Sequence, residues 1–347
     1  MSDRPIVPGG QPYGSHRVLE PRGGLPQPAQ RVDNDFSRLF EGEVLLAVET
    51  LNVDAASFTQ MEKEGDPAHI VLRTVADRGK QHNPVTGSGG MLLGRVVQLA
   101  PGRPDGEQLH VGDRIATLVS LSLTPLRIDR IKGVRPPSAQ LDVDGEAVLF
   151  ASGAYAKLPA DLPERLALAA LDVAGAAPQV ARLVKRDDVV VVLGAGGKSG
   201  ILCVAEARRV GGPGARIVGL EASERAAGEL RELGLCDAVV SADARDPVAV
   251  RGAVLGATGG READVAFSCV NVQGAELGAI LATRDRGIVY FFAMSTSFTK
   301  AALGAEGVGK DVDLFIGNGY ARGHAEHTLA MLRDMPAVRA LFEKRYG

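Results

Sequence analysis

A run of small residues, GAGGKSG at positions 194–200, follows the apolar stretch 189–193 and precedes a helical pattern that continues through Val210. Glycines at such a strand-to-helix turn allow a sharp bend, close approach of a pyrophosphate to the backbone and tight packing of the helix. The helix N-terminus adds backbone donors and a favourable dipole. The run predicts a dinucleotide site that includes Gly194, Gly196, Gly197, Lys198, Ser199 and Gly200. A glycine-rich turn that binds no ligand is the alternative.

An acidic residue, Glu221, ends the next apolar stretch, about twenty positions beyond Gly200. A carboxylate there accepts hydrogen bonds from the ribose hydroxyls and repels a 2′-phosphate, which favours NAD over NADP. Ser223 and Arg225 lie just beyond and would bind a phosphate if Glu221 turned away, so NADP stays open as a cofactor. We place the remaining cofactor contacts at Asp243, Asn271, Ala293 and Met294.

The cysteines and histidines form no metal motif. Cys203, Cys236 and Cys269 are too widely spaced for a zinc pattern or a disulfide framework, which fits a reducing cytoplasm. His324 and His327 share one helical turn, but no third acidic or thiolate ligand adjoins them. We therefore expect no bound metal.

The elements that must position these residues change in character near residue 150. Before it, short β-type runs such as 43–50 and 95–99 alternate with Gly, Pro and Asp, which indicates an irregular β-barrel. Beyond residue 162, helical patterns alternate with short, unbroken apolar runs at 189–193, 217–220, 238–240, 265–268 and 288–292. Such runs are typical of a parallel sheet that helices cover on both faces.

Composition narrows the class of partner. The chain has 347 residues, enough for about two domains, and 45% of them are hydrophobic and 23% charged, as in globular proteins. The net charge of −3 argues against a nucleic-acid or anionic-membrane partner and favours a small molecule. The N-terminal residues lack the apolar core of a signal peptide, and no run of 18 apolar residues occurs. We therefore expect a cytoplasmic protein that does not enter membranes.

The order of these parts resembles the medium-chain dehydrogenase/reductase superfamily, through GEVLLAV at 42–48, GDRIA at 112–116 and the glycine run. The resemblance implies an α/β fold with a GroES-like β-barrel domain at 1–160, to which segment 320–347 returns, and a Rossmann doubly wound parallel sheet at 161–319. The places of the superfamily's catalytic zinc ligands correspond here to Asn52, Ser88 and Val173, with Asp172 beside the last. An amide, a hydroxyl and a valine cannot replace two thiolates and an imidazole, so the resemblance implies a zinc-free enzyme.

A closer resemblance covers most of the chain. It is to the L-erythro-3,5-diaminohexanoate dehydrogenases of lysine fermentation, and it is carried by GSHRVLEP (14–21), LPQP (25–28), ASFTQ (56–60), NPVTGSGG (83–90), SLSLTPL (120–126) and SFTKAALGAEG (297–307). It implies oxidative deamination of 3,5-diaminohexanoate at C3 to (S)-5-amino-3-oxohexanoate, with reduction of NAD(P)⁺ and release of ammonia, in a cleft between the two domains.

That reaction needs a proton acceptor near C3, and partners for a carboxylate and a second ammonium. Asp172 is our first choice for the base or amine anchor; helix capping is its structural alternative. Lys300 and Glu306 are the other catalytic candidates, although solvated charges explain them equally well. For substrate binding we name Arg127 and Lys80 toward the carboxylate, and the hydroxyls of Thr86, Ser88, Ser120 and Thr124, each of which could instead satisfy turn backbone.

Two further functions stay open from the sequence. One is a zinc-free quinone or enoyl reductase of the same fold, whose cleft would hold few charges. The other is a non-enzymatic dinucleotide-binding protein. We expect a homodimer in each case.

Overall fold

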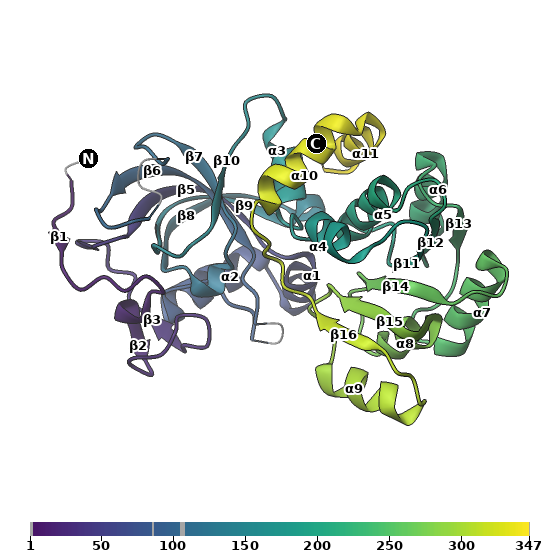
Figure 1. Ribbon diagram of the computed structural model, residues 1–347. Coiled ribbons are helices and arrows are strands. Elements are labelled where there is room, and N and C mark those ends of the chain that lie inside the picture. The colour runs from purple at the N-terminus through teal and green to yellow at the C-terminus, as the bar shows by residue number, and fades with distance from the viewer. Residues whose placement is uncertain (1–2, 85–86, 105–107, 347) are drawn as a thin grey trace. The chain divides into compact units, whose positions relative to one another are not determined.

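The computed structural model describes residues 3–84, 87–104 and 108–346, which form two compact units (Figure 1). The first unit extends to Asp172 and the second comprises Val173–Arg345. The sequence placed the boundary at residue 160. The structure places it later because α3 (Glu164–Leu171) belongs to the first unit, where Glu164 accepts a 2.7 Å hydrogen bond from Arg114.

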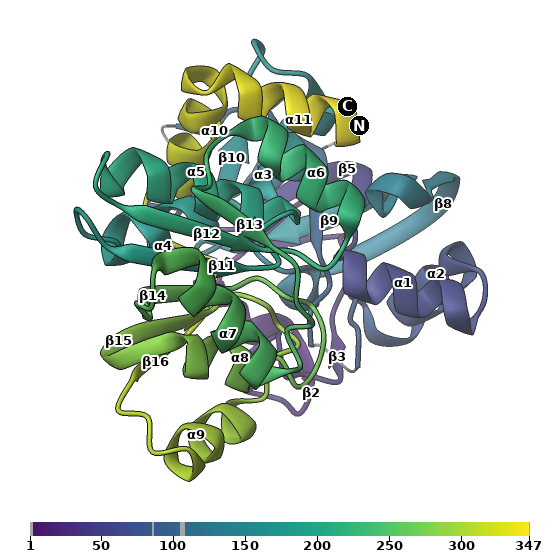
Figure 2. The same ribbon diagram turned by 90° about the vertical axis from the view of Figure 1, so that its right-hand side faces the viewer.

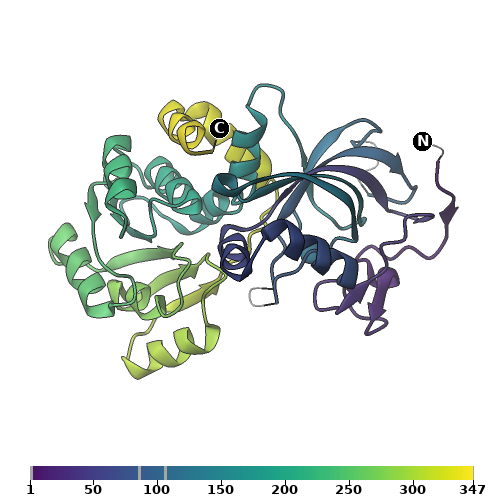
Figure 3. The same ribbon diagram turned by 180° about the vertical axis from the view of Figure 1, so that it is seen from behind.

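The first unit is built on a six-stranded antiparallel sheet of order β10-β7-β6-β5-β9-β8. Its strands are β5 (Val44–Asn52), β6 (Met91–Leu99), β7 (Arg114–Thr117), β8 (Leu126–Arg135), β9 (Gln140–Leu149) and β10 (Tyr155–Lys157). Both pairings of β5 shift register between Val48 and Thr50, and such irregularities bend a strand. The sheet accordingly curls (Figure 3). Among the described residues its edges β10 and β8 do not pair with each other, so the expected barrel is an open one.

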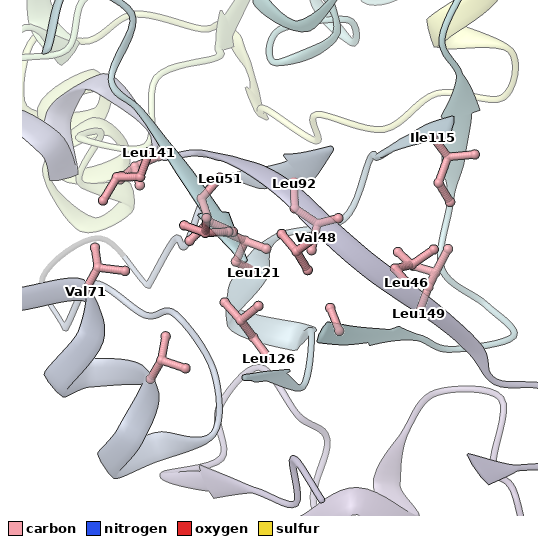
Figure 4. Close-up of a cluster of buried hydrophobic side chains, with 14 of the residues drawn as sticks. Leu46, Val48, Leu51, Val71, Leu92, Ile115, Leu121, Leu126, Leu141 and Leu149 are labelled. Atoms are coloured by element: carbon pink, nitrogen blue, oxygen red, sulfur yellow. The ribbon is translucent and has the colours of Figure 1, made fainter. Parts of the chain in front are cut away.

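The core of this unit lies inside the curl. Leu46, Leu51, Leu92 and Leu141 come from strands, and Val71 comes from α2 (Figure 4). Burial of such side chains contributes about 1.5–3 kcal/mol each. The smaller elements are β1 (Ile6–Val7), η1 (Ser15–Arg17), β2 (Val18–Glu20), β3 (Arg31–Val32), β4 (Leu39–Phe40), α1 (Ala55–Glu64), α2 (Pro67–Arg78), η2 (Leu121–Leu123) and η3 (Pro136–Ser138).

The second unit contains a six-stranded parallel sheet of order β13-β12-β11-β14-β15-β16. Its strands are β11 (Val189–Leu193), β12 (Arg216–Leu220), β13 (Ala238–Val240), β14 (Ala263–Ser268), β15 (Thr283–Phe291) and β16 (Asp313–Ile316). The five apolar runs of the sequence therefore predicted β11 to β15 correctly, and the doubly wound parallel sheet is confirmed. The edge strand β16 was missed.

Helices cover both faces of this sheet (Figure 2). On one side lie α4 (Ala176–Leu183), α5 (Lys198–Gly211) and α6 (Glu224–Leu233), and on the other lie α7 (Pro247–Thr258), α8 (Glu276–Ala282) and α9 (Phe298–Gly307). Val250 and Ile280 of the second group pack against Val191 and Val289 of the strands. Because apolar side chains on both faces are covered in this way, the strands lack an apolar–polar alternation.

The last two helices, α10 (His324–Asp334) and α11 (Pro336–Tyr346), correct the expected domain assignment. The sequence returned segment 320–347 to the barrel, but the structure groups these helices, apart from Tyr346, with the second unit. The reason is local packing: α10 lies against α4, and the Thr328 hydroxyl donates a 2.8 Å hydrogen bond to the Ala174 carbonyl.

Within the described ranges, no single helix is long and apolar enough to cross a membrane. The bent pair formed by α3 and α4 passes that test by length and composition only.

Candidate active site

The glycine loop of the second unit has the shape that a dinucleotide requires. Gly194 has a φ of +72°, which favours glycine. A Cβ on Gly200 would lie 2.1 Å from the Gly194 carbonyl oxygen, and a Cβ on Gly196 would lie 2.7 Å from Glu221 Oε2. Gly197 is the N-cap residue of α5 and has no side chain. No side-chain oxygen therefore occupies the position at the start of the helix where an anion would bind. The loop therefore fits a pyrophosphate, and Lys198 and Ser199 begin the helix behind it.

The carboxylate of Glu221 is held by two backbone donors. Glu221 Oε2 accepts a 2.9 Å hydrogen bond from the Gly196 N–H, and Oε1 accepts a 2.9 Å bond from the Ser223 N–H. Glu221 therefore connects the end of β12 to the glycine loop. Ser223 caps α6, and Arg225 is exposed on its first turn.

The other predicted cofactor residues lie at the ends of later strands. Asp243 forms a bidentate ion pair with Arg245, and the hydrogen bonds from Arg245 lower the pKa of Asp243 to about 2. Asn271 and Met294 are exposed and Ala293 is half-buried, within the loops that follow β14 and β15. Parallel strands present their carboxyl ends along one edge, where ligands of such sheets bind.

A residue that the sequence analysis missed also reaches the glycine loop. Arg345 of α11 donates from Nη1 to the Gly196 carbonyl oxygen, and from Nε and Nη2 to Glu229 of α6. Lys344 lies 3.0 Å from the same carboxylate, and these two cations lower the pKa of Glu229 to about 2. A lone arginine near the end of a sequence carries no motif, so no pattern identified this contact.

In the first unit, Asp172 is hydrogen-bonded to Asn52, a residue that the sequence resemblance assigned to a zinc-ligand place. Asp172 follows the last turn of α3, and its Oδ1 accepts a 3.0 Å hydrogen bond from Asn52 Nδ2 at the end of β5. Asn52 Oδ1 in turn accepts a 3.1 Å bond from Gln140 Nε2 of β9. Both amides are 1% exposed. Asp172, Asn52 and Gln140 therefore form one hydrogen-bonded polar cluster.

The predicted substrate-binding side chains are mostly engaged in local structure. Ser120 Oγ accepts hydrogen bonds from the Gly89 and Ser122 N–H groups, and Ser88 Oγ accepts a long one from the Gly90 N–H. Thr124 is buried and donates to the Ser120 carbonyl. Thr86 lies outside the described residues.

The two cationic candidates likewise have protein partners. Lys80 is 0% exposed, and its ammonium donates to the carbonyls of Pro26 and Gln27. Burial lowers the pKa of Lys80 to about 8, with a smaller contribution from Arg78. Arg127 binds Glu146 at 2.8 Å and Asp129 at 3.0 Å.

Lys300 and Glu306 lie on the exposed face of α9 in the second unit. The Lys300 N–H donates to Ser297 Oγ, which caps the helix. The structure therefore places Lys300 and Glu306 in one unit and Asp172 in the other.

Among residues 3–84, 87–104 and 108–346, no three His, Cys, Asp or Glu side chains are grouped so that they could hold a metal ion. His327 lies 3.2 Å from Glu206, and His324 packs edge-on against Tyr320. All three cysteines are free thiols, and the sulfurs of Cys203 and Cys269 lie 3.8 Å apart.

The curled antiparallel sheet and the parallel sheet with its glycine loop define an oxidoreductase fold of the medium-chain dehydrogenase/reductase class. Two solved structures share this fold. Mycobacterial Rv1454c complexed with NADPH superposes with a TM-score of 0.57 at 18% identity, over 88% of this chain and 89% of that chain. An alcohol dehydrogenase from Thermotoga maritima gives 0.56 at 17% identity, over 88% and 84%. At these identities the likeness concerns the fold alone.

The sequence comparisons identify the family. Residues 16–159 match the model of the L-erythro-3,5-diaminohexanoate dehydrogenase N-terminal domain. The L-erythro-3,5-diaminohexanoate dehydrogenases of Acetoanaerobium sticklandii and Fusobacterium nucleatum subsp. nucleatum are 54% and 49% identical to the chain. Each alignment covers 96% of this chain and 98% of the relative. The chain belongs to this family of dehydrogenases, as the sequence motifs predicted.

Proposed function

We propose that the chain catalyses the NAD(P)-dependent oxidative deamination of L-erythro-3,5-diaminohexanoate at C3, a step of lysine degradation that yields (S)-5-amino-3-oxohexanoate and ammonia. The observation that carries this proposal is the 54% identity, over 96% of the chain, to a dehydrogenase of that name. In this proposal the dinucleotide loop of the second unit supplies the cofactor site, and Asp172 of the first unit supplies the proton acceptor.

The glycine loop, the start of α5 and Glu221 hold the cofactor, which when bound supplies a hydride acceptor. Asp172 binds the 3-amino group and takes its proton, because C3 is oxidised only when that amine is neutral. The amine lone pair then assists oxidation, and water adds to the resulting imine to release ammonia. Since no metal polarises a substrate oxygen in this scheme, a secondary alcohol should be a poor substrate.

The direct test incubates purified protein with 3,5-diaminohexanoate and either NAD⁺ or NADP⁺. We expect absorbance at the wavelength of the reduced nicotinamide to rise, with one ammonia released per cofactor reduced. A small panel of β-amino acids defines the specificity, and a quinone with NADPH serves as the alternative substrate pair. Absence of ammonia with both cofactors would refute the proposed reaction.

We propose NAD as the preferred cofactor. The carboxylate of Glu221, held in place by two backbone donors, would accept from the ribose 2′-hydroxyl and repel a 2′-phosphate. We expect kcat/KM to be at least 10-fold higher with NAD⁺, and Glu221→Ser to reduce that preference. Equal or better kinetics of the unaltered enzyme with NADP⁺ would contradict this assignment.

We also propose that the reaction needs no metal. At the place corresponding to the zinc ligands, Asn52 donates to Asp172 and accepts from Gln140, which suits a carboxylate and not a cation. Activity should therefore be unchanged, within about 2-fold, after dialysis against a strong chelator. One tightly held zinc per chain by elemental analysis, with activity lost on its removal, would exclude the proposal.

We propose a homodimer that pairs the edge strand β16 with β16 of a second copy about a twofold axis. The described residues leave the outer edge of β16 unpaired, and Phe315 and Ile316 on it are 42% and 67% exposed. An exposed apolar edge of this kind is a template for strand pairing. By light scattering, Ile316→Lys should shift the protein toward monomer. Val248→Lys, which alters an apolar residue 74% exposed on α7, should not.

We propose a reducing, cytoplasmic location. The support is chemical: three cysteines are present, all three are free, and two of them lie within 3.8 Å without forming a disulfide.

A further inference from the structure

The amides of Gln140 and Asn52 have defined orientations, because each accepts one hydrogen bond at its oxygen and donates one from its nitrogen. Ser138 Oγ donates to Gln140 Oε1 at 3.3 Å, and Gln140 Nε2 donates to Asn52 Oδ1 at 3.1 Å. Asn52 Nδ2 then donates to Asp172 Oδ1 at 3.0 Å. The chain of donors therefore runs in one direction and ends at a carboxylate.

The sheet fixes the geometry of this relay. Asn52 and Gln140 are directly opposite each other in the antiparallel pair of β5 and β9, and both are 1% exposed. The buried amides have one favourable arrangement, since a flipped Asn52 would point its carbonyl oxygen at the Asp172 carboxylate.

We propose that Asn52, oriented by Gln140, is a positioning residue that holds the Asp172 carboxylate in the orientation in which it acts on the substrate amine. The inference rests on the proposed function, in which Asp172 binds and deprotonates that amine. It extends that function by giving Asn52, which stands where the superfamily resemblance expected a zinc ligand, a role in an amide relay, the hydrogen-bonded series Gln140–Asn52–Asp172. Neither Asn52 nor Gln140 is required to touch the substrate.

Two substitutions test the relay. Asn52→Leu removes the donor to Asp172 and keeps the branching pattern of the side chain. Gln140→Glu leaves Asn52 in place but replaces its donor by an acceptor. Arg135, which lies opposite Gln140 in β8, favours the charged form of the new carboxylate. Asn52 should then turn its nitrogen toward this new carboxylate and its oxygen toward Asp172. Both variants should lower kcat/KM for 3,5-diaminohexanoate at least 10-fold, with the Kd for NAD⁺ changed less than 2-fold.

The matched control is Thr50→Val. Thr50 lies on the same strand, is also buried, and donates a 3.1 Å hydrogen bond across to Asp142 of β9, but its hydroxyl does not donate to Asp172. The Thr50→Val variant should change kcat/KM less than 2-fold. In an Asp172→Asn background, Asn52→Leu should lower kcat/KM by less than a further 2-fold, because the carboxylate that Asn52 positions is absent. An equal loss in both backgrounds, or full activity of Gln140→Glu, would overturn the proposal.

A measurement that does not depend on turnover separates this inference from the reaction assignment. In protein labelled with 15N-asparagine, the side-chain amide protons of Asn52 should be protected from solvent exchange, and should exchange at least 10-fold faster in Asp172→Ala, which removes their acceptor. Equal exchange rates would refute the relay even in an active enzyme. If the unaltered protein releases no ammonia but shows this protection, the proposed reaction fails and the relay stands. Where Asn52→Leu does not fold, Gln140→Glu supplies the kinetic readout and Asp172→Ala supplies the exchange readout.

Discussion

Asp172→Asn should lower kcat/KM for 3,5-diaminohexanoate by roughly 10²-fold or more, the range typical for loss of a general base. The substitution keeps an oxygen that can accept the hydrogen bond from Asn52, so the local structure should persist while the charge is lost. The rate of the unaltered enzyme should rise with pH as the 3-ammonium of the substrate loses its proton. Steady-state kinetics across pH, with ammonia quantified, measure both effects.

Asp142→Asn is the matched control for that variant. Asp142 is also a carboxylate of the first unit that accepts a side-chain hydrogen bond from β5, through Thr50, and it pairs with Arg135 at 2.6 Å. We expect its kcat/KM to stay within about 2-fold of the unaltered enzyme. Full activity of Asp172→Asn would remove that residue from the mechanism and leave the reaction assignment intact.

Gly200→Ala should weaken dinucleotide binding at least 10-fold. The added Cβ would lie 2.1 Å from the Gly194 oxygen and 2.7 Å from Ala195 Cα, both backbone atoms, so the loop or the start of α5 must move. Overpacking of this kind costs about 1–3 kcal/mol, and the displaced loop would no longer match a pyrophosphate. Calorimetric titration of NADH into the purified variant gives the affinity directly.

Gly197→Ala provides the comparison within the same loop. Its φ of −77° suits any residue, and its Cβ would meet the Gly194 oxygen at 3.4 Å, an ordinary contact. We expect its affinity for NADH to change less than 3-fold. Similar affinities of Gly200→Ala and Gly197→Ala would show that close packing at residue 200 does not shape the site.

The sequence predicted the parallel sheet well because unbroken apolar runs report burial on both faces, a local property of each strand. It missed β16 because that edge strand is mostly exposed and carries no such run. It also misplaced the C-terminal helices, since an apolar helix face shows that packing occurs but not against which unit. Their contact with α4 depends on tertiary structure.

The candidate site likewise combines features that the local sequence indicates with features that only the tertiary structure determines. Asp172 and the glycine loop could be named as candidates from the sequence because an acid in an apolar stretch and a run of glycines are both unusual locally. The partners of Asp172 were not identifiable, because Asn52 and Gln140 become neighbours only through the register of β5 and β9. Lys80 appeared available for a substrate carboxylate, but its ammonium is buried against the backbone of a distant segment.

The contact between Arg345 and the Gly196 carbonyl has a consequence for the timing of folding on the ribosome. The two residues are 149 positions apart. At synthesis rates of about 5–20 residues per second, the glycine loop would be complete roughly 7–30 seconds before its guanidinium partner is added. The nascent second unit would pass through a stage in which β11, α5 and α6 are present while Glu229 and the loop carbonyl still face water. Dinucleotide bound at that stage would meet a glycine loop that lacks the Arg345 contact.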